Sequence, residues 1–203
     1  MPRSSAVHNL PDAIPLWLKI VYGAGVPVIL VIYWREYGPT NFLWLSDMAL
    51  LCTAASALTG NSLLASMPAV GVLPLEIAWA VDFVSGGRLI GLAGYMFDEK
   101  YPLELRAISL FHLALPPTLI FLLWKLGYDS RALFFQTVLT WAALIAAYVA
   151  TDPSQNINWV FGPGAKPQQM LPPLAYLALE MAMLPVIVIL PMHFLLKHLF
   201  APT

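Results

Sequence analysis

The chain has little charge and almost no cysteine. Only 10% of its 203 residues are Asp, Glu, Lys or Arg, whereas soluble domains carry about 25%. So few charges would not cover the surface of a water-soluble fold. Cys52 is the single cysteine, so the chain cannot form an internal disulfide or a cysteine-based zinc site.

Runs of Lys and Arg are also missing, and the formal net charge is −1. Proteins that bind nucleic acid through phosphates usually carry basic patches. We therefore expect no nucleic-acid partner, and no pattern in the sequence indicates a cofactor or a metal. Alternating apolar and polar residues, which would predict strands, are absent too.

The chain is instead rich in apolar residues: 60% of its residues are hydrophobic and its mean hydropathy is +0.75. A membrane-spanning helix needs about 20 mostly apolar residues. The apolar runs predict an all-α polytopic membrane helix bundle in a single domain, residues 1–203. The six predicted spans are 14–34, 42–59, 63–84, 104–125, 131–150 and 172–197. Residues 86–97 are too short to span alone, so they either lie at the interface, re-enter the membrane or form a seventh, short helix.

The first apolar run is interpreted as a retained helix. It ends in Trp34-Arg35-Glu36, whereas a cleaved leader ends in small residues. The Lys and Arg residues divide equally between the two sides of six spans, so the positive-inside rule gives no orientation. We expect an integral protein of the cell (inner) membrane.

Carboxylates inside these apolar runs predict a polar core. A charge in hydrocarbon costs at least ~2.5–3.5 kcal/mol on insertion scales, so such residues usually face a protein interior. The predicted core carboxylates are Asp47, Glu76, Asp82 and Glu180. Glu76 and Asp82 point ~120° apart on one helix, so each needs a partner from elsewhere, and Arg88 is the expected cation for Asp82.

His112 lies inside the fourth predicted span. Imidazole exchanges protons near neutral pH, which makes His112 a candidate for proton transfer; the alternative is a core histidine bonded to a neighbouring carboxylate. Ser46, Asp47 and His112 together have the residue types of a nucleophile, an orienting acid and a base. Prolines within the spans leave carbonyls without their helical donor, as Pro185 does for Met181, and these need other partners.

The longest predicted connection runs over residues 151–171 and contains Asn156, Asn158 and Trp159. Loops longer than ~12–15 residues are often lids or binding loops. The alternative is a loop that rests on the lipid headgroups through its aromatic residues.

The order of these features resembles the YwaF-like family of integral membrane proteins with six or seven helices, over about residues 41–198. Trp44-Leu45-Ser46-Asp47 falls on that family's His-x-Cys-Asp motif, and His112 falls on its central histidine. Asn156-Ile157-Asn158-Trp159 falls on its Asn-containing loop, and Tyr176-Leu177-Ala178-Leu179-Glu180 on its last helix. Some relatives in that family are lipid acyltransferases, but Trp44 and Ser46 replace the motif's His and Cys.

The sequence leaves several functions open. The first is a non-catalytic membrane subunit or lipid-binding protein, with membrane lipids and other membrane chains as partners. The alternatives are an intramembrane enzyme of the lipid acyl-transfer type, and a carrier for protons or a small molecule. An enzyme needs Ser46, Asp47 and His112 within hydrogen-bond reach of one another.

Overall fold

The computed structural model describes residues 14–164 and 166–200, which form helices and loops without a strand. The polar residues 1–13 before the first span lie outside the described part. Helix α1 (Leu16–Tyr37) ends at Gly38, whose φ of 77° favours glycine. A short 3-10 helix η1 (Pro39–Leu43) then leads into α2 (Leu45–Thr59).

The third predicted span is a bent pair of helices. Helix α3 (Ser62–Gly71) and helix α4 (Leu73–Val84) meet at Val72 with a bend of 56°. Pro74 sits at the start of α4 and has no amide hydrogen to continue the α3 bonding ladder, which explains a break at this point. The break sets Glu76 in the first turn of a new helix.

The second half of the chain contains the longest helices. Helix α5 (Leu103–Ile108) continues after a short turn as α6 (Phe111–Leu126), and α7 (Ala132–Ala150) follows. The last helix comprises α8 (Pro173–Met183), a π-helical segment η4 (Leu184–Ile189) and α9 (Leu190–Phe200). At its π segment, Pro185 leaves the carbonyl of Met181 without a helical donor, and the Trp141 indole of α7 donates to that carbonyl at 2.7 Å.

Four helices are long and apolar enough to cross a membrane, and a fifth is counted if the bent α3–α4 pair is one span. They are compatible with an integral membrane protein. The described spans are Leu16–Tyr37, Leu103–Leu126, Ala132–Ala150 and Pro173–Phe200. Helix α2 has 15 residues, fewer than the ~20 that a perpendicular span needs. Six spans therefore stay a prediction.

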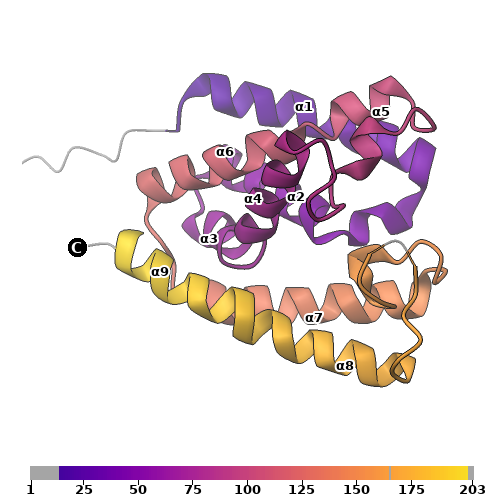
Figure 1. The fold of residues 1–203 in the computed structure, drawn as a ribbon. Coiled ribbons are helices and arrows are strands. Elements are labelled where there is room, and N and C mark those ends of the chain that lie inside the picture. The colour runs from indigo at the N-terminus through magenta and orange to yellow at the C-terminus, as the bar shows by residue number, and fades with distance from the viewer. Residues whose placement is uncertain (1–13, 165, 201–203) are drawn as a thin grey trace, which may run out of the picture.

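Helix α3 lies at the centre of the bundle, against α2, α6 and α7. Its small residues Ala65 and Ala69 are fully buried and let these neighbours approach closely. Helices α8 and α9 run beside α7 along one outer edge of the molecule (Figure 1).

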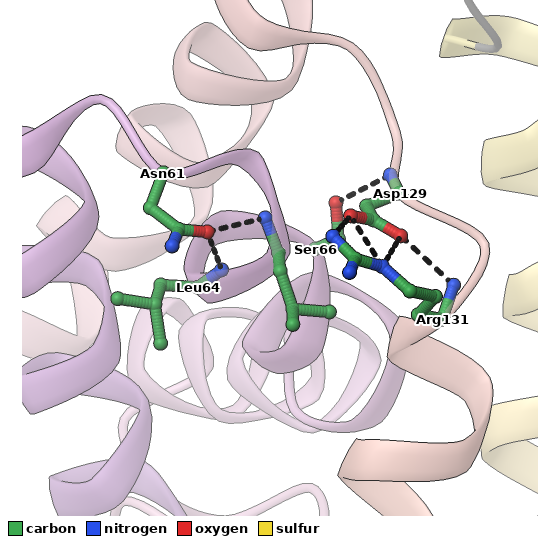
Figure 2. A network of polar contacts seen from close by, with 6 residues as sticks. Asn61, Leu64, Ser66, Asp129 and Arg131 are labelled. Atoms are coloured by element: carbon green, nitrogen blue, oxygen red, sulfur yellow. Dashed lines mark hydrogen bonds and ion pairs between the residues drawn. The ribbon is translucent and has the colours of Figure 1, made fainter.

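Two groups of polar contacts lie on and beside α3, one at Asn61 and one around Ser66, Asp129 and Arg131 (Figure 2). Asn61 caps α3 by accepting from the amides of Leu63 and Leu64. Ser66 accepts from the amide of Asp129 at 2.9 Å, and the Asp129 carboxylate accepts from the Arg131 guanidinium at 2.6 Å. The Ser66–Asp129 bond ties α3 to the α6–α7 turn.

Candidate functional site

A buried pair of ionisable side chains lies where α4 meets α6. Nδ1 of His112 is 2.7 Å from Oε2 of Glu76, and the two side chains are 13% and 3% exposed. A carboxylate oxygen facing Nδ1 favours the tautomer in which Nδ1–H donates, and in that tautomer Nε2 is the acceptor of the ring. Nε2 makes no hydrogen bond within the described part of the chain. This carboxylate–histidine pair joins two residues that the sequence analysis singled out separately.

Aromatic rings hold the histidine in place. The Trp79 ring stacks on His112 with centroids 4.6 Å apart, and the Phe111 ring stacks at 4.2 Å. Tyr95 lies 6.4 Å from Trp79 by ring centroids. The buried indole nitrogen of Trp79 has no hydrogen-bond partner of good geometry among residues 14–164 and 166–200. The imidazole is therefore oriented by one carboxylate and two flat apolar rings.

A second carboxylate, Asp47, is buried close enough to Glu76 to interact with it electrostatically. It stands in the first turn of α2 and accepts from the Asn41 side chain at 2.9 Å. Two carboxylates and an imidazole in one enclosed cluster are groups that store and pass protons.

Tyr33 and Ser109 form a further buried polar contact, at 3.0 Å, that sequence reasoning missed. Ser109 donates its hydroxyl to the carbonyl of Leu105, so Tyr33 must donate to Ser109. Tyr33 also interacts electrostatically with Asp47. No pattern in the sequence distinguishes a single hydroxyl inside an apolar run, so the contact between Tyr33 and Ser109 could not be predicted.

Asp82 organises the segment after α4. Its buried carboxylate accepts from the amides of Leu89, Ile90 and Ala93, at 2.9, 2.7 and 2.7 Å. The expected ion pair with Arg88 was wrong: Arg88 is exposed and makes no ion pair with Asp82 in the part of the chain that the structure describes.

Of the three alternatives left open for residues 86–97, the structure does not have the seventh, short helix. Within this range only Gly94–Phe97 is helical, as a single 3-10 turn η2. The remainder is a loop held by Asp82, with positive φ at Gly86, Gly87 and Gly91. A loop replaces the helix because one carboxylate gathers its amides, which a helix would have used internally.

The long loop after α7 is anchored to the start of α2. Asn158 accepts from the amide of Leu45 at 2.9 Å and donates to the carbonyl of Leu43 at 2.7 Å. Buried Asn156 donates to the carbonyl of Gly162 and accepts from the amide of Phe161. Asn156, Asn158 and Trp159 all have positive φ, a conformation that costs energy and that these bonds maintain.

Two residues predicted for the site have other surroundings. Ser46 makes no hydrogen bond to Asp47 or His112 among residues 14–164 and 166–200, and the grouping of these three as a catalytic set stays a prediction. Glu180 lies on α8 and lines a separate groove, described below.

An apolar groove of about 440 Å³ runs along α4 and α6. Its lining residues are Ile77, Ala80, Val81, Val84, Leu113, Pro116 and Pro117. Ile77 follows Glu76 directly and Leu113 follows His112, so the groove runs along a neighbouring face of the same two helices, and the pair itself does not line it. Its apolar walls suit a hydrocarbon chain.

Within the described residues, no group of three or more His, Cys, Asp or Glu side chains is placed to hold a metal ion. The chain was compared with protein-family models, curated proteins and solved structures, and none of them matches it.

Proposed function

We propose that this chain is an integral protein of the cell (inner) membrane that binds a membrane lipid and has a general base, His112, at the lipid site. The observation that carries the proposal is the 2.7 Å bond from His112 Nδ1 to Glu76 beside the α4–α6 groove. This bond leaves Nε2 of the ring unpaired.

The pair has the arrangement of a base held by an orienting acid. Glu76 fixes the ring and the tautomer, and it stabilises the imidazolium that forms when Nε2 takes a proton. The same logic operates in hydrolases in which an acid, a histidine and a nucleophile act in series. The resemblance to the YwaF-like family points to lipid acyl groups, and it falls on His112 as well.

The step that this geometry supports is acyl transfer from a lipid ester to water or another hydroxyl. Nε2 of His112 removes the proton from the attacking hydroxyl as its oxygen adds to the ester carbonyl. The imidazolium then returns the proton to the departing alkoxide, so the enzyme ends unchanged. The acyl chain lies in the groove. Where Ser46 is the attacking hydroxyl, it holds the acyl group as an ester until a second attack, by water, releases the fatty acid and restores the serine.

The test uses the full chain in nanodiscs that contain a phospholipid labelled in its acyl chain. Lipid binding is measured by native mass spectrometry, and labelled fatty acid or transferred acyl product by chromatography. His112→Gln and Glu76→Gln should abolish product, while the exposed His198→Gln serves as the matched control. Val81→Trp should fill the groove and reduce binding, whereas the exposed Val149→Trp on α7 should not.

The outcomes separate the alternatives. Product that disappears with His112→Gln supports the enzyme. Binding that falls with Val81→Trp, without any product, supports a lipid-binding protein that does no chemistry. Wild-type protein that neither retains lipid nor forms product overturns both.

A second candidate, a non-catalytic subunit, is favoured by one observation. In the most apolar stretch of the last span only 11% of residues are buried, against 39% in the span 103–126. Such an uncovered helix is available to another membrane chain.

A further inference from the structure

The last helix carries a carboxylate without a partner. Glu180 lies seven residues after Pro173, about 10 Å along the helix at 1.5 Å per residue. The side chain is half-buried, and its enclosed Oε2 has no hydrogen-bond partner among the residues that the structure describes. A carboxylate within an apolar span is expected to be paired, and residues 14–164 and 166–200 supply no donor to Glu180.

A donor stands on the same side of the helix. Tyr176 lies four residues before Glu180, one helical turn away, and both line a groove of about 230 Å³. The other lining residues are Leu179, Met183, Leu184, Ile187 and Val188. The Tyr176 hydroxyl makes no hydrogen bond within the described part of the chain. The Tyr176 hydroxyl, a donor, and the Glu180 carboxylate, an acceptor, thus lie in an apolar groove without using each other or another described residue.

We propose that this face, defined by Tyr176, Leu179, Glu180, Met183 and Ile187, binds the same face of a second copy of the chain. Across a two-fold axis every contact is made twice: where a residue of one copy touches a given residue of the other, the reverse contact forms as well. The Tyr176 hydroxyl of each copy then donates to the Glu180 carboxylate of the other. One donor and one acceptor a turn apart make the face complementary to itself.

The apolar residues of this face suit the same contact. Leu179, Met183 and Ile187 are 46%, 45% and 59% exposed and surround the polar pair. Another face of the helix contacts its own chain, because Leu177 and Ile189 are buried and Met181 bonds Trp141 of α7. Packing of side chains and two symmetric hydrogen bonds are the forces that associate helices in lipid.

The test is the oligomeric state of the full chain in mild detergent and in nanodiscs. Native mass spectrometry should find a dimer for the wild type. Tyr176→Phe removes both donors and keeps the ring, so the dimer-to-monomer equilibrium should fall roughly tenfold. Tyr148→Phe on α7 is the matched control and should leave the equilibrium unchanged. A melting curve checks that each variant is folded.

Crosslinking locates the interface. In a Cys52→Ser background, Ile187→Cys should form a disulfide-linked dimer under mild oxidation. Val21→Cys on α1, which is 57% exposed, should not. A monomeric wild type overturns the proposal, even if Glu180 then binds a cationic helix of another protein or a lipid headgroup. A dimer that is insensitive to Tyr176→Phe, or that Ile187→Cys fails to crosslink, overturns this face as its interface.

Discussion

Replacing Asp82 by Asn tests whether the loop after α4 is held by backbone bonds or by an ion pair. One oxygen of the carboxylate accepts from the amides of Leu89 and Ile90, and the other accepts from the amide of Ala93. An asparagine retains one oxygen and turns an NH₂ group toward the remaining amide. That amide then loses its acceptor in a fully buried position.

The expected cost follows from these three bonds. A hydrogen bond to a charged group contributes ~1.5–3 kcal/mol, and a neutral one ~0.5–1.5 kcal/mol. Losing one bond and weakening two gives a loss of roughly 2–4 kcal/mol in the free energy of unfolding. For a chain of this size each kcal/mol lowers Tm by about 2–4 °C, so Asp82→Asn should melt roughly 5–15 °C below the wild type.

The assay is a melting curve in detergent together with hydrogen exchange over residues 85–102. Asp82→Asn should speed exchange in that segment, because the amides bonded to Asp82 become accessible. Arg88→Gln is the control: the Arg88 side chain is exposed, so its replacement should cost less than ~0.5 kcal/mol. Equal losses of Tm for Asp82→Asn and Arg88→Gln would support an ion pair between the two residues and refute this reasoning. Wild-type melting of Asp82→Asn would refute it as well.

Three further results are expected. Asn158→Gly keeps the positive φ but loses two side-chain bonds, so the free energy of unfolding should fall by about 1–3 kcal/mol. An unchanged Tm would mean that the loop is not anchored there. Gly71→Ala places a Cβ 2.5 Å from Cγ of buried Gln136 and should cost ~1–3 kcal/mol, and added Gln136→Ala should recover part of that loss in a thermal melt. Arg131 bonds the Asp129 carboxylate and lowers its pKa, so Asp129→Asn should melt below the wild type at pH 7; the difference should shrink below about pH 4, where the unfolded carboxyl takes its proton first and the folded one follows, and a pH-independent difference would contradict this.

The candidate site was partly visible in the sequence. Glu76 and His112 stand out because ionisable residues are rare in apolar spans. The sequence also offered a bonded core histidine as an alternative for His112, and the structure places a carboxylate on it. Which carboxylate it is depends on the depth and rotation of two helices, which no local pattern encodes.

Loops were less predictable than spans. Residues 86–97 are apolar enough to be read as a helix, yet Asp82 gathers their amides into a loop. In the same way, Asn158 was singled out in a loop, but its bonds reach residues more than 100 positions away in the chain. Local propensity does not report on bonds of such sequence separation.

The sequence by itself determined that the chain is helical and apolar, where its long helices run, and which few residues are polar inside them. These properties follow from composition and from the length that a bilayer requires, both of which are local. Only the tertiary structure decided that the third span bends at Val72, that Glu76 bonds His112, and that Oε2 of Glu180 has no hydrogen-bond partner in the described part of the chain. Pairing of buried polar groups is settled by how helices pack against one another, because each group takes its partner from a different helix.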